Sequence, residues 1–227
     1  MVRLSEIMTV LSGHTGLLLF FAMVGLLIAT FTEQLQLYAK YRGAELSTVA
    51  AGYNNAMKIM VFNRLGAVFY FLLVAMAIDF GTGPTKLTYF MGAVMLVLAV
   101  CSFTMLLILG NEEEVPGASL FSSLCGLKLK GQLVVVMSLV ATIFNLMGLT
   151  IPMILGAYFP EYRLTLVNTG FLFNAVFTLV SVFIIENYIA YMIDKKSEGL
   201  LVFARLIFLA RGIGAIATGV FLIVFFG

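Results

Sequence analysis

The chain has 227 residues, of which 62% are hydrophobic and only 11% are charged, and its mean hydropathy is +1.11. This composition excludes an ordinary soluble domain and indicates an integral membrane protein. The net charge is +2, and no polar segment carries a basic stripe, which excludes a nucleic-acid binder. We therefore expect its partners to be membrane lipids or molecules dissolved in the membrane.

Residues for metal or covalent chemistry are scarce. His14 is the only histidine, which excludes a bis-histidine haem and most metalloprotease motifs. Cys101 lies in an apolar run and Cys125 in a polar connection, so no disulfide framework is indicated. We expect no cofactor and no metal, and a transporter rather than an enzyme.

Apolar runs predict an all-α membrane protein with six transmembrane helices, each long enough to cross a hydrocarbon core of ~30 Å. Residues 1–15 have the spacing of a short interfacial helix. The spans are expected at residues 16–37, 55–78, 87–109, 133–158, 164–185 and 200–226. Pro152 is expected to kink the fourth span. Residues 1–227 thus form a single polytopic domain, since no long polar segment leaves room for another.

The connections between the spans set the orientation. Lys and Arg are more numerous on the face opposite the N-terminus, so the positive-inside rule places that face in the cytoplasm and both termini outside. The longest connection, residues 110–132, lies on the cytoplasmic face. Its acidic run, Glu112 to Glu114, is interpreted as solvated charge, and its apolar part, residues 118–127, is expected to rest on the membrane interface.

The two ends of the chain repeat a pattern of charges. Glu33 ends the first span and Glu186 ends the fifth. The span that follows each of them carries two cations six residues apart, namely Lys58 with Arg64 and Arg205 with Arg211. This pattern predicts a duplicated helix hairpin, formed by spans 1–2 and 5–6, whose two copies face each other across a cavity.

The four cations differ in their expected depth. A charge at membrane depth costs about 2.5 to 3.5 kcal/mol, so it usually faces a cavity or a partner. At 1.5 Å per residue from the outer helix ends, Arg64 and Arg211 lie within the apolar layer. Lys58 and Arg205 lie near its cytoplasmic boundary, from which long side chains reach the headgroups.

Two interpretations of the deeper arginines remain open. In the first, Arg64 and Arg211 form ion pairs with Glu33 or Glu186. In the second, they bind an anionic ligand. Four cations against two carboxylates leave a surplus that an anionic headgroup would neutralise, and arginine binds phosphate bidentately. Asparagines beside them either donate to a sugar or phosphate or link helices. The candidate substrate-binding residues are Arg64, Arg211, Lys58, Arg205, Asn55, Glu33 and Glu186.

Motifs in four regions carry a resemblance to a known family. They are Leu37-Tyr38 with Arg42-Gly43, Asn55 with Arg64, Pro160-Glu161-Tyr162-Arg163 with Thr165, and Leu209-Ala210-Arg211-Gly212-Ile213-Gly214. In these motifs the chain resembles the Amj-type lipid II flippases, small polytopic proteins of the bacterial cytoplasmic membrane. The proline-glutamate-tyrosine-arginine turn is the most specific of the four.

The resemblance implies a flippase for cell-wall synthesis in the bacterial cytoplasmic membrane. Its substrate would be an anionic polyprenyl-pyrophosphate-linked glycolipid of the lipid II type, whose pyrophosphate Arg64 and Arg211 would bind with help from Lys58 and Arg205. Two alternatives remain: a proton- or ion-coupled small-molecule transporter that uses Glu33 and Glu186, and a non-catalytic membrane subunit of a larger complex. An intramembrane lipid enzyme is a more distant alternative.

Overall fold

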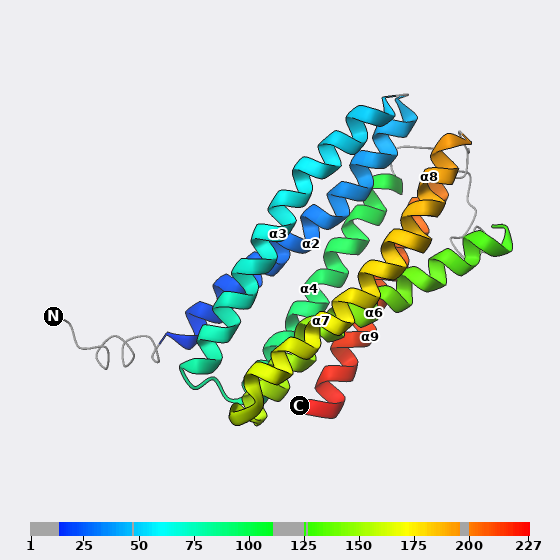
Figure 1. Cartoon of the computed structure of the whole chain (residues 1–227). Coiled ribbons are helices and arrows are strands. Elements are labelled where there is room, and N and C mark those ends of the chain that lie inside the picture. The colour runs from blue at the N-terminus through cyan, green and yellow to red at the C-terminus, as the bar shows by residue number, and fades with distance from the viewer. Residues whose placement is uncertain (1–13, 47, 111–124, 126, 196–199) are drawn as a thin grey trace.

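The computed structural model describes residues 14–46, 48–110, 125, 127–195 and 200–227 (Figure 1). Six of its helices are long and apolar enough to cross a membrane, and there is no strand in the described part of the chain. The chain is therefore a multi-pass, all-helical membrane protein, as predicted. The predicted interfacial helix falls mainly on residues 1–13, which lie outside the described residues, as do Glu112 to Glu114 and residues 118–124.

The helices run up and down the bundle in chain order. They are α2 (Thr15–Glu45), α3 (Val49–Asp79), α4 (Pro84–Gly110), α6 (Leu129–Tyr158), α7 (Arg163–Val180), α8 (Asn187–Asp194) and α9 (Leu200–Phe226). A 3-10 turn, η1 (Pro160–Tyr162), precedes α7, and a π-helical segment, η2 (Ser181–Glu186), joins α7 to α8 without a break. We call the continuous helix of residues 163–194 the α7–α8 rod. Within this rod, residues Asn168–Asp194 are long and apolar enough to cross a membrane.

Several helices extend beyond the predicted spans at the predicted cytoplasmic end. Residues 38–54 lie between the first two predicted spans and are therefore expected to form a link, but the part that contains Lys40 and Arg42 forms the last turns of α2. Its leucine, alanine, lysine and glutamate favour helix, and no proline interrupts them. The fifth span likewise continues past Ile185 to Asp194. These longer helices bring extra charged side chains into the bundle. Pro152 lies inside α6, which continues on both sides of it.

Small residues let α2 and α3 pack as a tight hairpin. A Cβ added at Gly66 would lie 2.6 Å from the Gly25 carbonyl oxygen, and one at Gly43 would lie 2.6 Å from the Gly52 Cα. The amide of Asn63 donates to the Ala29 carbonyl oxygen at 2.7 Å between these two contacts. The two helices are thus held by close backbone contacts beside the connecting turn and near the middle of α3, and by a hydrogen bond between these contacts.

The sixth span packs through the small residues that the sequence places there. Gly219 of α9 packs against Met95 of α4, and Gly214 packs against Thr142 of α6. The main partners of α9 are therefore α4 and α6, whereas its contact with α8 is slight. Since α2 and α3 pack closely along their length, the two ends of the chain do not pack as copies of one hairpin.

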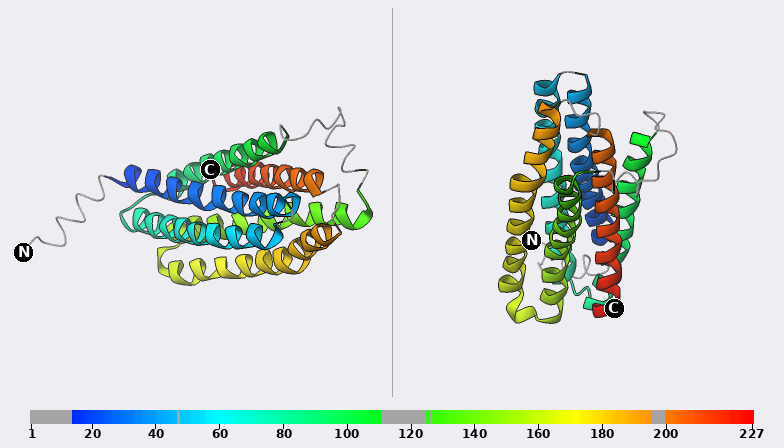
Figure 2. Two further views of the ribbon diagram at one scale, coloured as in Figure 1. Left: turned by 90° about the horizontal axis from the view of Figure 1, so that it is seen from above. Right: turned by 90° about the vertical axis from the view of Figure 1, so that its right-hand side faces the viewer.

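The bundle has one open side. In both views of Figure 2, the α7–α8 rod lies at one edge of the bundle and α4 lies at the opposite edge. The rod packs on α6, but neither α7 nor α8 packs closely against α3 over the described residues. The first turn of α2 and the last turn of α9 lie at the same end of the bundle (Figure 1), because an even number of spans returns the chain to the side on which it starts.

Candidate functional site

An ion pair joins the last span to the first. Arg211 of α9 places its Nη1 atom 3.3 Å from Oε1 of Glu33 and 3.5 Å from Oε1 of Gln34, both on α2. The side chains of Arg211 and Glu33 are only 14% and 29% exposed. The sequence left a structural ion pair as one interpretation of Arg211, and the structure shows this pair with Glu33.

Gln34 ties this ion pair to a third helix. Its side chain is buried, and its Nε2 donates to Oγ of Ser102 on α4 at 3.0 Å. One amide thus accepts from Arg211 of α9 while it donates to α4. A buried amide with both groups occupied fixes the relative positions of α2, α4 and α9.

A second ion pair lies nearer the predicted cytoplasmic end. Nζ of Lys40 on α2 is 2.7 Å from both carboxylate oxygens of Glu186, the last residue of η2. Nζ also lies 5.3 Å from the centroid of the Tyr53 ring of α3, within cation–π distance. The sequence did not predict this pair, because Lys40 was assigned to a link outside the membrane.

The two ion pairs lie along one face of α2. Glu33 and Lys40 are seven residues apart, which brings them within about 20° of each other around the helix axis and about 10 Å apart along it. We call Glu33, Lys40, Glu186 and Arg211 the charge cluster. Its two positive and two negative charges cancel, so the cluster by itself is neutral.

Arg64 lies on the face of α3 that is turned toward the cluster. Tyr53 marks this face because its ring contacts Lys40. Met60 and Arg64 follow Tyr53 at spacings that keep them within about 20° of it around the axis. The neighbour of Arg64, Asn63, bonds to Ala29, one turn from Glu33 on α2. Arg64 is exposed, and it makes no ion pair with any residue that the structure describes.

Three of the predicted site residues lie elsewhere. Asn55 and Lys58 are exposed on α3, at about 160° and 140° from Tyr53 around the axis, so they face away from the cluster. Arg205 is about 120° from Arg211 around α9. It lies on the face that packs against α4, and its Nε is buried with no hydrogen-bond partner among the described residues. A spacing of six residues turns Lys58 away from Arg64 and Arg205 away from Arg211. A spacing of nine residues places Asn55 on the face of α3 opposite Arg64. These three residues therefore do not join the site.

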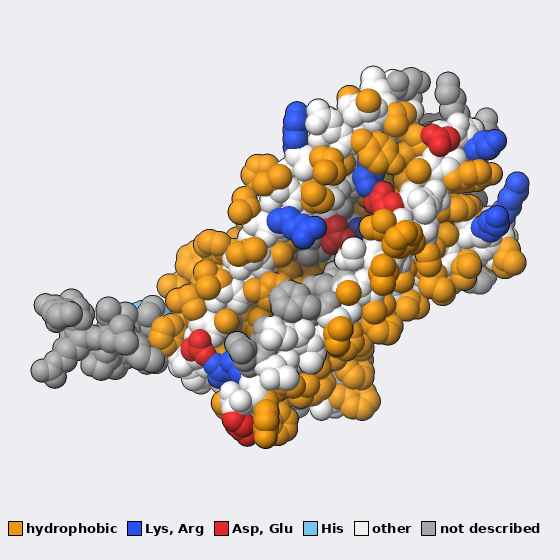
Figure 3. All heavy atoms as spheres, in the orientation of Figure 1, with side chains coloured by type: hydrophobic (Ala, Val, Ile, Leu, Met, Phe, Trp, Pro, Cys, Tyr) orange, Lys and Arg blue, Asp and Glu red, His pale blue; other side chains and the backbone are white. Residues whose placement is uncertain are grey.

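A groove separates α3 from the α7–α8 rod, and an ion pair joins the rod to the hairpin of α2 and α3 near each end of the groove. Lys40–Glu186 lies at the predicted cytoplasmic end, and Asp79, the last residue of α3, pairs with Arg163, the first residue of α7, at the other end. Figure 3 shows side chains of both charges gathered in a hollow between α3 and the rod, with apolar side chains around it. We call this hollow the lateral groove.

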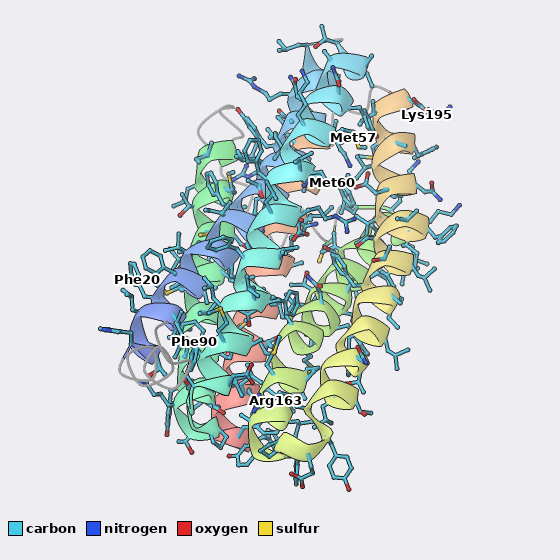
Figure 4. The ribbon with its side chains drawn as sticks, turned by 60° about the vertical axis from the view of Figure 1, so that its left-hand side comes forward. Phe20, Met57, Met60, Phe90, Arg163 and Lys195 are labelled. Atoms are coloured by element: carbon cyan, nitrogen blue, oxygen red, sulfur yellow. The ribbon has the colours of Figure 1, made fainter. Side chains whose placement is uncertain are left out.

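The stick view shows what borders the lateral groove. Met57 and Met60 lie between α3 and α8, whereas Phe20 of α2 lies on the outside of the bundle (Figure 4). Lys195 and Arg163 mark the two ends of the α7–α8 rod in the same view. Methionine adapts to irregular surfaces, so this wall of the groove suits contact with flexible apolar chains.

The arrangement favours binding of anions over metal chemistry. The described residues contain no group of three or more His, Cys, Asp or Glu side chains that could hold a metal ion. What they offer is guanidinium and ammonium groups, each partly shielded from solvent and directed toward a carboxylate. Such groups bind phosphate oxygens by charge-assisted hydrogen bonds when they leave that carboxylate.

Comparisons with protein-family models, with curated proteins and with solved structures give no match. A functional assignment therefore depends on the geometry of the charge cluster and the lateral groove.

Proposed function

We propose that this protein is a flippase-like transporter that moves an anionic polyprenyl-pyrophosphate-linked glycolipid, of the lipid II type, across the bacterial cytoplasmic membrane. The observation that carries the proposal is the charge cluster beside a groove that opens sideways toward lipid. A headgroup can enter such a groove from the membrane while its polyprenyl chain stays in the bilayer. The resemblance to the Amj-type flippases supports the same substrate class.

The charges near the groove suit a pyrophosphate. The charge cluster is neutral, and Arg64 adds a positive charge on the α3 wall, about one helical turn from the depth of Glu33. A pyrophosphate carries at least two negative charges. One would pair with Arg64, and the other would pair with a second cation that has left its carboxylate. Arg211 is the nearest candidate, because it already reaches the face of α2 that borders the groove.

The apolar border of the groove suits the lipid chain. The face of α3 turned away from α2 exposes large apolar side chains along most of its length, namely Met57, Val61, Phe62, Leu65, Val68, Phe69 and Leu72. These side chains contact lipid in the membrane, so a polyprenyl chain can lie along α3 at every depth of its passage. Only the headgroup would need the polar groove.

Transport in liposomes tests this proposal directly. Purified protein is reconstituted with fluorescent lipid II, and the fraction of lipid accessible to an impermeant quencher is followed over time. We expect fast exchange with the unaltered protein and a loss of at least about tenfold in rate for Arg211→Ala and Arg64→Ala, since each removes a charge-assisted contact worth about 1.5 to 3 kcal/mol. Lys58→Ala is the matched control on α3 and should leave the rate unchanged. Exchange no faster than in protein-free liposomes would refute the proposal.

A proton-coupled transporter is the second candidate, because both carboxylates of the cluster are paired with basic groups at membrane depth. In that case a proton would replace the cation on Glu33 or Glu186 during transport. Glu33→Gln would then abolish transport and remove its dependence on a pH gradient. A rate of lipid II exchange that is equal with and without a pH gradient would contradict coupling to protons.

A further inference from the structure

The Lys40–Glu186 pair is unequal in its exposure. The side chain of Lys40 is 13% exposed, whereas that of Glu186 is 40% exposed. Lys40 is also held in place by the Tyr53 ring, 5.3 Å from its Nζ. The carboxylate is therefore the partner that can leave, and the ammonium group would stay behind in a poorly hydrated position. A buried ammonium without a counter-ion is strongly unfavourable, so another anion must replace the one that leaves.

The helix that carries Glu186 has a local distortion that can move this residue. Glu186 is the last residue of η2, and the π-helical hydrogen bonds of η2 leave one turn wider than in the α-helices on either side. π-Helical turns are rare, occur mostly as single turns inside α-helices and are frequent at functional sites. The hydroxyl of Ser181, the first residue of η2, is buried and has no hydrogen-bond partner among the residues that the structure describes. A change of η2 toward α-helix would rotate Glu186 relative to α7 and away from Lys40.

Arg64 lies on the same face of α3 as Tyr53, whose ring contacts Lys40. Tyr53, Met60 and Arg64 share this face, and Arg64 lies about 16 Å from Tyr53 along the axis. The two ends of this line thus carry a paired ammonium group at the predicted cytoplasmic end and a guanidinium group without an ion pair among the described residues. A headgroup that enters at Lys40 would have its next cationic contact at Arg64.

We propose that Lys40 is the entry site for the headgroup phosphate and that Glu186 is a displaceable counter-ion that keeps the site occupied until a phosphate replaces it. The ligand class is a phosphate or pyrophosphate borne on a lipid. This inference rests on the proposed function, and it assigns to Lys40 and Glu186 distinct roles. Lys40 binds the substrate, whereas Glu186 competes with it.

Binding measurements with two opposing variants test the inference. The protein in lipid nanodiscs is titrated with geranylgeranyl pyrophosphate. Glu186→Gln removes the competitor, so affinity should rise by about tenfold if Lys40 is paired about nine-tenths of the time in the unliganded protein. Lys40→Gln should lower the affinity, whereas Lys40→Arg should retain it. Glu161→Gln is the matched control for Glu186, since Glu161 is an exposed carboxylate in η1, at the other end of the rod, and it should change nothing.

A measurement on the unaltered protein avoids any effect of the variants on folding. Labelling of Glu186 by a hydrophobic carbodiimide is followed by mass spectrometry with and without geranylgeranyl pyrophosphate. A carboxylate that separates from its ammonium partner is no longer covered by it and is more accessible to the reagent. Labelling of Glu186 should therefore rise when the ligand binds. Unchanged labelling under saturating ligand would overturn the inference.

The remaining outcomes separate the inference from the proposed function. A purely structural ion pair predicts that Glu186→Gln weakens binding as Lys40→Gln does, and this result would overturn the role of Lys40 while transport of lipid II by the unaltered protein still stands. Inorganic pyrophosphate that binds as tightly as the lipid form would overturn the lipid assignment. A protein that neither binds the lipid pyrophosphate nor moves lipid II would refute both proposals.

Discussion

Glu33 and Lys40 lie on one face of α2, and each holds a partner of opposite charge from a different helix, Arg211 of α9 and Glu186 of the α7–α8 rod. One helix face therefore connects the centre of the bundle to its most exposed edge. Since the two pairs share no side chain, a substitution can remove one pair and leave the other in place.

Loss of one partner of the Arg211–Glu33 pair should destabilise the fold more than loss of both. Arg211→Met leaves the Glu33 carboxylate half-buried without a counter-ion, and we expect a loss of about 1 to 3 kcal/mol, below the range for fully buried pairs. Adding Glu33→Leu to this variant should recover part of the loss. Unfolding in mixed detergent micelles measures Arg211→Met, Glu33→Leu and the double variant. A loss in the double variant equal to the sum of the two single losses would show that the pair contributes no coupling.

Replacement of Gln34 should lower the free energy of unfolding more than the loss of a single hydrogen bond would. Gln34→Leu removes the acceptor of Arg211 and the donor to Ser102, so two polar groups lose a partner at once. We expect a loss of about 1 to 2 kcal/mol, near the upper end for hydrogen bonds between membrane helices. Ser102→Ala, which removes only one of these bonds, should cost less. The same unfolding assay ranks the two variants, and the reverse order would contradict the bridging role.

The sequence predicted the class of the fold well and the site only in part. Apolar length identifies six spans because the membrane imposes a minimum length on each helix. The charged residues were harder to assign, because a link between spans and the last turns of a helix have similar composition. Lys40 was placed in such a link. Its distance of seven residues from Glu33 was a visible signal that both lie on one helix face.

Helical phase explains why three of the candidate residues lie apart from the charge cluster. The cations in the second and sixth spans were grouped by their spacing of six residues, but this spacing turns two side chains about 120° apart. Lys58 therefore lies away from Arg64, and Arg205 away from Arg211. The Asp79–Arg163 pair joins residues far apart in sequence, and no local pattern indicates such a contact. Only the packing of the helices brings these residues together.

Gly66 should not tolerate a side chain. A Cβ there would lie 2.6 Å from the Gly25 carbonyl oxygen and 2.8 Å from the Ala29 nitrogen, and backbone atoms cannot rotate away. We expect Gly66→Ala to destabilise the protein by about 1 to 3 kcal/mol, although alanine favours helix over glycine. Gly16→Ala is the control, because nothing lies within 4 Å of its added Cβ. Thermal unfolding should show a lower midpoint for Gly66→Ala and no decrease for Gly16→Ala.

The Asp79–Arg163 pair should hold the outer end of the lateral groove closed. Arg163 also donates from Nε to the Gly156 carbonyl oxygen at 3.4 Å, so its side chain is fixed to α6 while it reaches Asp79. Asp79→Asn removes the charge on α3, and we expect the distance between spin labels on the outer turns of α3 and α7 to become longer or more broadly distributed. The partly exposed pair contributes little to stability, about 1 kcal/mol or less, so the fold should persist.

A charge exchange completes this test. Asp79→Arg combined with Arg163→Asp restores an ion pair of opposite direction and should narrow the label distances again, whereas Asp79→Arg alone should widen them further through repulsion. Glu161→Gln is the matched control, because Glu161 is an exposed carboxylate in the adjacent turn η1. If lipid II exchange requires the outer end to open, Asp79→Asn should also raise the exchange rate in liposomes. Label distances that are identical in the unaltered protein and in Asp79→Asn would mean that α6 alone positions α7, and that the ion pair does not control the groove.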